Sequence, residues 1–345
     1  MKQLLNTLYV TTPDAYLRLE GETVCVMIEK EKRLQVPLHH LNAFVLFDTM
    51  MSPALMGRCA ADGRSIIWLN RSGRFMARME GPVNGNILLR QAQYRAADNA
   101  EQSLKIARRF IAGKIRNSRQ VLMRGARDSK NEQEKTALVQ AARLLAGNLG
   151  KLASAESADT LRGLEGDSAR IYFAALPKLI RPSARESFAF TTRNRRPPLD
   201  CFNALISFLY ALVLGDCRSA LETVGLDPQL GFLHTVRPGR QSLALDLLEE
   251  FRAPICDRLA LTIIIINREQ LQAKDFDFRD GGSVMLNDAG RKTVIAAFQA
   301  RKQEEINHPV LQQSIYIGLL PQIQARLLAR YLRGDIETYL PFLQQ

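Results

Sequence analysis

The sequence predicts an α+β protein with two domains: a small N-terminal β-rich domain over residues 1–85 and a larger, mainly α-helical domain over residues 86–345. The first observation behind this prediction is a series of short runs before about residue 85, rich in Val, Ile, Leu and aromatic residues and separated by turn signals. The second is that apolar residues beyond this point recur at the helical period of about 3.6. A chain of 345 residues can supply a core to each domain.

Each strand of the first domain is predicted from one short apolar run. Gly21 lies between two of these runs, AYLRLE and TVCVMIE, and predicts a hairpin. Ser52 and Pro53 precede ALMGRCAA and predict one short helix, with Ser as its N-cap and Pro at its first position. No catalytic cluster is visible in this domain. The predicted strands are TLYV, AYLRLE, TVCVMIE, RLQVPL, NAFVLFD, SIIWLN and RFMARME.

The domain boundary is predicted in residues 81–86, GPVNGN, because Gly, Pro and Asn interrupt regular structure there. Beyond it we expect helices over residues 87–127, with a break at Gly113, over residues 131–148, and from Ser157 to Pro182. A small strand or hairpin is expected over residues 281–286. Further helices are predicted in CFNALISFLYALVLGDCRSALETVGL, in SLALDLLEEFRAPICDRLALTIIIINRE and from about residue 288.

The composition is that of a soluble globular protein, with 46% hydrophobic and 24% charged residues. No apolar run reaches about 18 residues, so no transmembrane helix is expected. The N-terminus has no small-residue cleavage site, which makes a secretory signal unexpected. The five cysteines are scattered and never form a CxxC pair, which argues against a disulfide framework or a zinc ribbon. We therefore expect a cytoplasmic protein.

The charge balance points to a polyanionic partner. Forty-seven Lys and Arg stand against 35 Asp and Glu, a net charge of +12, and such a field attracts nucleic acid. A generally basic, solvated surface remains the alternative. Arg193, Arg195 and Arg196 precede Pro197 in a predicted loop, where arginines suit a bidentate grip on phosphate. A second basic cluster, a stripe with few acids to balance it, contains Arg95, Lys105, Arg108, Arg109, Lys114, Arg116, Arg119, Arg124, Arg127 and Lys130.

Glu165 is a candidate functional residue inside the helical run LRGLEGDSARIYF. Gly163 and Gly166 flank it, and two glycines inside a helix cost about 1 kcal/mol each relative to alanine. Close approach of a neighbouring helix or of a ligand would offset that cost. The alternative is that Glu165 is a surface residue paired with Arg162 or Arg170, and periodicity alone slightly favours this alternative.

His234, Asp246 and Glu249 form a second group of candidates. His234 lies in a turn-like stretch, and Asp246 and Glu249 are three residues apart on the next helix, so their carboxylates share a face. Leucines surround the pair, and acids on a buried face need a cation. That cation is either an arginine (237, 240 or 252) or a divalent metal ion. One histidine with several carboxylates suits Mg²⁺ or Mn²⁺ better than Zn²⁺.

Four segments together resemble a known family. They are LRGLEGDSARIYF, RNRRPPLDCFNALISFLYALV, DPQLGFLHTVRPGRQSLALDLLEEFR and LNDAGRK, and they closely resemble the CRISPR adaptation integrase family, the universal, larger Cas protein of spacer acquisition. The run from Arg237 to Arg252 is similar to the branch found with type I-C systems. The resemblance covers essentially the whole chain. Walker, nucleophile-elbow, HExxH, Rossmann and EF-hand motifs are missing from the sequence, so nucleotide-driven phosphotransfer is not supported.

The resemblance implies the roles of the candidate residues. Glu165, His234 and Glu249 match the family's metal ligands, for Mg²⁺ or Mn²⁺, and Asp246 matches a further acidic position beside them. The last ligand is often Asp in this family, so the sequence leaves open whether Asp246 or Glu249 binds directly. The family also implies a homodimer, for which the β-rich domain is the expected interface, and a small second Cas protein that joins it in holding a protospacer duplex.

The implied activities are metal-dependent DNA cleavage and strand transfer that inserts new spacers into the CRISPR array. Arg237 is expected to stabilise charge on the phosphate. Arg193, Arg195, Arg196, Arg108 and Arg116 are expected to contact DNA without reading its sequence. Two alternatives remain: a non-catalytic nucleic-acid-binding scaffold, in which the acids only pair with arginines, and a related stand-alone nuclease or transposon integrase.

Overall fold

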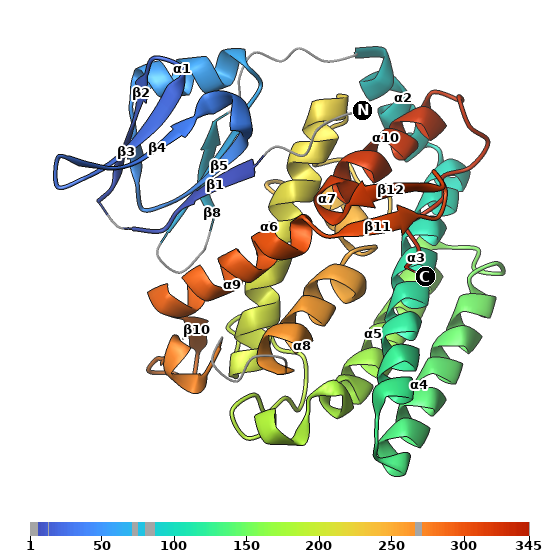
Figure 1. Cartoon of the computed structure of the whole chain (residues 1–345). Coiled ribbons are helices and arrows are strands. Elements are labelled where there is room, and N and C mark those ends of the chain that lie inside the picture. Colours follow the sequence, from blue (N-terminus) through green and yellow to red (C-terminus); the bar gives the residue numbers. More distant parts are fainter. Residues whose placement is uncertain (1–5, 13, 71–74, 80–86, 266–270, 345) are drawn as a thin grey trace. The chain divides into compact units, whose positions relative to one another are not determined.

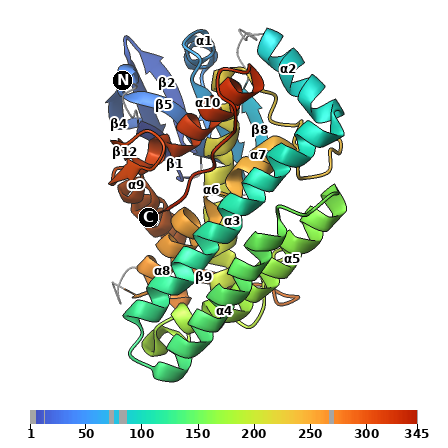
Figure 2. The same cartoon turned by 90° about the vertical axis from the view of Figure 1, so that its right-hand side faces the viewer.

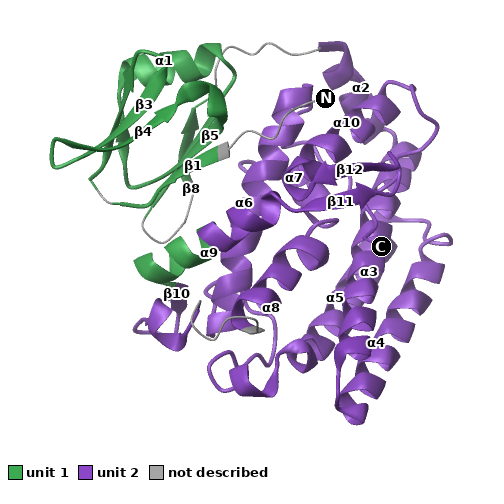
Figure 3. Cartoon of the chain, in the orientation of Figure 1, with its two compact units in different colours: residues 1–85, 286–295 green, residues 86–285, 296–345 purple. Residues whose placement is uncertain are grey.

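The computed structural model describes residues 6–12, 14–70, 75–79, 87–265 and 271–344. The chain divides into two compact units, drawn in different colours in Figure 3. Unit 1 contains residues 1–85 and 286–295, and unit 2 contains residues 86–285 and 296–345. The expected boundary segment, 81–86, lies outside the described residues. The first unit is rich in strands and the second is mainly helical, so the predicted fold class is confirmed.

Unit 1 contains two four-stranded sheets, drawn in blue to teal in Figure 1. One has the order β1-β5-β7-β8 and the other β4-β3-β2-β6. Every strand predicted from the sequence is present, and β2 and β3 form the expected antiparallel hairpin. The strands are β1 Asn6–Val10, β2 Tyr16–Glu20, β3 Thr23–Ile28, β4 Glu31–Pro37, β5 Leu41–Phe47, β6 Met50–Met51, β7 Ser65–Leu69 and β8 Phe75–Met79.

Helix α1, Pro53–Ala61, begins as the sequence predicts. The Ser52 side chain accepts a hydrogen bond from the Leu55 backbone N–H at 3.3 Å, and Pro53 occupies the first helical position. Leu55 and Cys59 of this helix are buried with Leu17, Phe44 and other residues of the strands. A single apolar core therefore holds unit 1 together. The two-residue strand β6, which pairs with β2, was not predicted because it is too short to show a pattern.

Unit 2 is built around long helices. Figure 2 shows α3, α4 and α5 running side by side. The small hairpin β9–β10 was expected, whereas the hairpin β11–β12 falls in a region predicted to be helical. The elements are α2 Ile87–Asp98, α3 Ala100–Asp128, α4 Glu132–Lys151, α5 Ala158–Ala175, α6 Cys201–Val224, α7 Ser242–Leu248, a π-helical turn Arg252–Asp257, α8 Arg258–Ile265, β9 Phe276–Phe278, β10 Val284–Leu286, α9 Asp288–Lys302, β11 Glu305–His308, β12 Gln313–Tyr316 and α10 Leu320–Leu332.

The expected break of the first long helix at Gly113 is wrong. The chain breaks instead at Asn99, whose side chain accepts a hydrogen bond from the Gln102 N–H at 2.9 Å and so begins α3. Gly113 lies inside α3, at a place where the helix is too closely packed for a side chain. A Cβ at Gly113 would lie 2.8 Å from Cβ of Pro341 and 3.3 Å from Cγ of Glu250. This glycine serves close packing against the C-terminal segment and does not end the helix.

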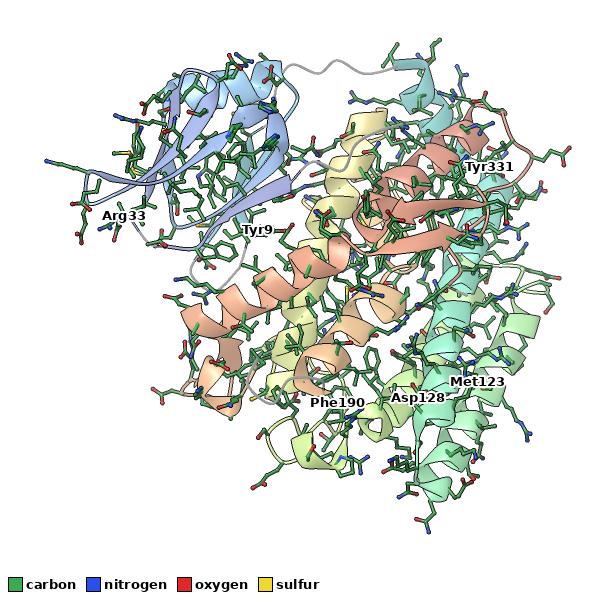
Figure 4. All side chains as sticks on the ribbon, in the orientation of Figure 1. Tyr9, Arg33, Met123, Asp128, Phe190 and Tyr331 are labelled. Carbon is green, nitrogen blue, oxygen red and sulfur yellow. The ribbon has the colours of Figure 1, made fainter. Side chains whose placement is uncertain are left out.

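Helix α6 forms the centre of the unit 2 core. Among the described residues, it alone is long and apolar enough to span a membrane by length and composition, an exception to the expectation from sequence. However, 67% of its most apolar window is buried inside the structure, as in a core helix. Phe190, labelled in Figure 4, packs edge-on against Phe202 of α6 with ring centroids 5.4 Å apart.

Candidate active site in the helical unit

Three elements of unit 2 bring the candidate residues together. Glu165 comes from α5, Glu249 follows the last residue of α7, and Lys114 of α3 lies between them. The Lys114 ammonium is 2.8 Å from Oε2 of Glu249 and also forms an ion pair with Oε1 of Glu165. Glu249 is buried, whereas the Glu165 side chain keeps 28% of its surface exposed. The site is therefore a pair of carboxylates, one buried and one partly exposed, bridged by one ammonium.

Asp246 and His234 form the second part of the site. Oδ2 of Asp246 accepts the backbone N–H groups of Phe232 and Leu233, at 2.7 and 3.0 Å. Oδ1 lies 3.0 Å from the backbone N of His234 and 2.6 Å from its Nδ1. A carboxylate so placed holds the proton on Nδ1, which leaves the lone pair on Nε2. Nε2 is 3.9 Å from Oε1 of Glu249, so it faces the bridged carboxylates.

Gly231 makes this arrangement of the backbone possible. A Cβ at this position would lie 2.7 Å from Oδ2 of Asp246 and 2.8 Å from Cβ of Ser242. The chain must pass this close for three successive N–H groups to converge on one carboxylate. The glycine of the motif Gly-Phe-Leu-His therefore has a specific role in positioning His234.

The Glu249 carboxylate is ionised because cations surround it. Burial alone would raise its pKa, but Arg252, Lys114 and His234 act in the opposite direction and lower the pKa to about 2. The Arg252 Nε lies 3.0 Å from Oε1 of Glu249. Oε2 of Glu249 is buried and lies 2.8 Å from the Lys114 ammonium, the distance of a charge-assisted hydrogen bond. This oxygen is thus neutralised by a side-chain ammonium.

The proposed arginine partners are only partly correct. Arg252 pairs with Glu249, as one alternative predicted. Arg162 and Arg170, in contrast, pair with Asp159 and Asp167, so the predicted pairing of Glu165 with either arginine is wrong. The four-carbon stem of Lys114 on α3 reaches Glu165 instead. Alanine side chains at Gly163 or Gly166 would meet no described atom within 4 Å, so close approach of a helix does not explain these glycines.

Arg252 is supported by a buried network. Its guanidinium carbon lies 4.5 Å from the centre of the Tyr210 ring, a cation–π contact. Tyr210 and Tyr172 donate hydrogen bonds to Asp257 at 2.7 and 3.0 Å. Burial raises the pKa of Asp257 to about 6, although both tyrosines act in the opposite direction. The network thus fixes the cation that faces Glu249.

The C-terminal segment packs against Glu250, the residue that follows Glu249. Glu250 accepts hydrogen bonds from Tyr339, from the Phe342 N–H at 2.7 Å and from Nε2 of Gln324 at 2.9 Å. Burial raises the pKa of Glu250 to about 8, against these hydrogen bonds. Asn117 of α3 donates to the carbonyl groups of Glu250 and Phe342, both at 2.8 Å. The backbone beside Glu249 is therefore tied to α3.

The donor set fits a hard divalent cation in its chemistry and charge. Two carboxylates and an imidazole nitrogen face one place, and a cation, the Lys114 ammonium, already lies between the carboxylates. As the side chains stand, no group of three or more His, Cys, Asp or Glu side chains in the described part of the chain is close enough to hold a metal ion. A metal ligated by both Glu165 and Glu249 would have to take the place of the ammonium.

The predicted DNA-contacting arginines differ in their surroundings. Arg195, Arg196, Arg116 and Arg237 are exposed. The guanidinium of Arg193 is instead held inside the protein: it donates to Oδ1 of Asn203 at 2.7 Å and to Oγ of Ser207 at 3.0 Å. Arg108 donates to the carbonyl group of Ala155 at 2.9 Å. The last two arginines thus support the structure around α3 and α6.

Sequence reasoning did not assign Lys114 and Gly231 to the site. Lys114 was counted only as part of the basic stripe, yet it lies three and four residues after Ile111 and Phe110, both buried. A lysine on the apolar face of a predicted helix indicates a buried partner of opposite charge. The sequence therefore contained a signal for the role of Lys114. It contained none for Gly231, because the residues close to Gly231 in space are distant from it in the sequence.

A family model described as CRISPR associated protein Cas1 matches residues 8–300 of the chain. Two curated relatives are similar over nearly their whole length. One, named CRISPR-associated endonuclease Cas1 1, is from Moorella thermoacetica, is 53% identical, and is covered over 99% of both chains. The other, named CRISPR-associated endonuclease Cas1 2, is from Rhodospirillum rubrum and is 52% identical with the same coverage.

Solved structures show the same fold. A Cas1 protein from Thermotoga maritima has a TM-score of 0.81 and 23% identity, covering 99% of this chain and 100% of the other. A casposase bound to an integration product has a TM-score of 0.81 and 20% identity, covering 97% and 93%. A Cas6-RT-Cas1–Cas2 complex has a TM-score of 0.82 and 21% identity, covering 100% of this chain and 37% of the other.

Proposed function

Because the chain belongs to the CRISPR-associated Cas1 family, we propose that it is a divalent-metal-dependent DNA endonuclease and integrase with its centre at Glu165, His234 and Glu249. Relatives at 53% and 52% identity are named endonucleases, and we assign that activity to this chain. The name of the casposase structure mentions an integration product, which supports extending the proposal to strand transfer. The type I-C branch remains a prediction.

The observation that carries this proposal is the charge-balanced pair of carboxylates. Glu249 is buried and ionised, and its Oε2 is paired with the Lys114 ammonium. Glu165 lies across from it and is partly exposed. Buried carboxylates held only by cations are suited to receive a metal ion. The donor set of two carboxylates and one imidazole favours Mg²⁺ or Mn²⁺.

Each residue of the candidate site then has one role. Glu165 and Glu249 would hold the ion, and His234 would present Nε2 as the third ligand. Asp246 already accepts hydrogen bonds from three backbone N–H groups and lies against Nδ1 of His234. We therefore assign Asp246 the role of orienting His234 and Glu249 that of direct ligand. This assignment is our proposal for the question that the sequence left open.

The bound ion would supply a Lewis acid that polarises a phosphoryl oxygen and lowers the pKa of the attacking hydroxyl or water. Strand transfer exchanges one phosphodiester for another, with a DNA 3′-hydroxyl as the nucleophile, and hydrolysis uses water in its place. Both reactions need the same residues. Exposed Arg237, three residues after His234, would stabilise charge on the phosphate.

The proposal includes DNA and a Cas partner. Exposed Arg195, Arg196 and Arg116 would contact the DNA backbone. Arg193 and Arg108 would support the structure around these contacts from their internal positions. One similar structure is named a Cas6-RT-Cas1–Cas2 complex, and this name supports a small Cas partner for this chain. We further propose a homodimer formed through the β-rich unit. The five cysteines are free, as expected for a protein of the cytoplasm.

The test combines the protein, its small Cas partner, protospacer DNA and a repeat-bearing plasmid, with Mn²⁺, with Mg²⁺ or with a chelator. We expect joined and cleaved products only with a divalent ion. Glu165→Gln should lower the rate at least about 100-fold while leaving DNA binding intact. Asp159→Asn, an exposed acid on the same helix, is the control and should retain full activity. No joining or cleavage with either metal would contradict the proposal, and full activity of Glu165→Gln would favour the non-catalytic scaffold.

A further inference from the structure

Lys114 is a charged residue of the site that the proposed chemistry does not use. Its side chain is 13% exposed, and its ammonium contacts one carboxylate from α5 and one beside α7. A lysine this buried needs compensating charge, because an unpaired ammonium is costly to remove from water. The two glutamates supply that charge. Lys114 thus occupies the place between the two proposed metal ligands.

The main chain around Lys114 is fixed by its neighbours. Gly113 lies against Pro341 and Glu250, and Asn117, three residues after Lys114, donates to the carbonyl groups of Glu250 and Phe342. The position of the lysine backbone relative to the Glu249 backbone is therefore set independently of the ion pair. The ammonium itself is a point charge on a flexible stem and makes no bidentate contact. It can leave the carboxylates without any change in α3.

On the basis of the proposed function, we propose that Lys114 is a built-in counter-ion that holds Glu165 and Glu249 together in the metal-free protein and competes with the divalent metal for them. Both cations need the carboxylates of Glu165 and Glu249, and the ammonium already contacts Oε1 of the first and Oε2 of the second. Two cations sharing these carboxylates would repel each other strongly at a separation of a few ångströms in a partly buried site. Metal binding therefore displaces the ammonium, and the protein gives up both ion pairs of Lys114 when the metal binds.

This exchange has two consequences that differ from those of a purely structural lysine. The metal-free protein is stabilised by Lys114, because the lysine balances the charges of both Glu165 and Glu249, whereas Arg252 pairs with Glu249. The affinity for metal is weakened by Lys114, because the ion must first displace it. A structural lysine would give the first effect without the second.

The test measures Mn²⁺ affinity by isothermal titration calorimetry and the melting temperature with and without Mn²⁺, on the full chain without DNA. The variants are Lys114→Met, which removes the charge, and Lys114→Arg, which keeps it. Lys105→Met removes an exposed lysine from the same helix and serves as control. Glu165→Gln removes one proposed ligand. If Lys114→Met does not fold, Lys114→Gln, uncharged but able to form hydrogen bonds, carries the same expectation.

We expect Lys114→Met to melt at a lower temperature than the wild type without metal and to recover on adding Mn²⁺. Its dissociation constant for Mn²⁺ should fall about tenfold or more. Lys114→Arg and Lys105→Met should bind Mn²⁺ as the wild type does. If Lys114→Met binds Mn²⁺ no more tightly than the wild type while Glu165→Gln binds it more weakly, the competition is refuted and the metal site stands. If Glu165→Gln binds as the wild type does, the proposed metal site itself is refuted.

Discussion

Asp246 and Glu249 lie three residues apart and are both buried, yet they are neutralised in different ways. Asp246 accepts hydrogen bonds from three backbone N–H groups and lies against Nδ1 of His234. Glu249 faces the side-chain cations Lys114 and Arg252, which contact its Oε2 and Oε1. A carboxylate fixed by the backbone cannot change partners, whereas one balanced by a side-chain ammonium can. Asp246 therefore suits a positioning role, and Glu249 suits a ligand.

The largest effect expected from breaking this difference is that of Asp246→Asn. The amide NH₂ would face backbone N–H donors or the protonated Nδ1 of His234, so the histidine would lose its fixed orientation. Loss of such a supporting group typically costs about 10- to 100-fold in metal affinity or activity. We expect about a 100-fold slower metal-dependent cleavage, measured in single-turnover assays.

The control for this variant is Asp275→Asn. Asp275 also accepts a backbone N–H, that of Gln272 at 2.7 Å, but it belongs to the turn before β9. Its substitution should leave the cleavage rate unchanged. A cleavage rate of Asp246→Asn close to that of the wild type would show that His234 does not depend on this carboxylate.

The ion pair between Glu249 and Arg252 depends indirectly on Asp257. Asp257 accepts a hydrogen bond from Tyr210, and the Tyr210 ring contacts Arg252. Burial raises the pKa of Asp257 from 3.8 to about 6. The folded chain therefore holds this proton more tightly than the unfolded chain, and the free energy of unfolding falls as pH rises from about 4 to about 6, by up to about 3 kcal/mol. Asp257→Asn removes this contribution.

The measurement for Asp257 is urea unfolding of both proteins at several pH values between 4 and 7. The stability of Asp257→Asn relative to the wild type should increase across this interval. The increase is expected because only the wild type has to ionise a buried carboxyl as pH rises. A difference in stability that does not change with pH would mean that Asp257 is already ionised at pH 4.

The smallest effects are expected from substitutions at two glycines, one beside Asp246 and one on the helix that carries Glu165. Gly231→Ala places a Cβ 2.7 Å from Oδ2 of Asp246 and should destabilise the protein by about 1–3 kcal/mol. Gly163→Ala is the matched control on α5, because a Cβ there meets no described atom within 4 Å. It should stabilise the protein by up to about 1 kcal/mol, since alanine favours the helix. Melting temperatures of the two variants that move in the same direction would contradict this contrast.

The elements whose signals are local were predictable from the sequence. The strands of unit 1 are short apolar runs separated by turn signals. Ser52 caps its helix as predicted, and a helix begins after Ser157, where its start was predicted. The second hairpin, β11–β12, was missed because its short strands lie between two helices and carry mixed polar residues. The break at Asn99 was misplaced because a buried glycine such as Gly113 has the same local signal as one that ends a helix.

By itself, the sequence determined the α+β class, the basic character, the family resemblance and the candidate residues Glu165, His234, Asp246 and Glu249. Only the tertiary structure decided how these residues divide their tasks. The backbone of residues 232–234 reaches Asp246 because Gly231 lets two segments approach closely, and Lys114 reaches Glu165 across 51 positions of the sequence. Such contacts depend on packing between elements far apart in the chain, and no local pattern of residues encodes the distance between them.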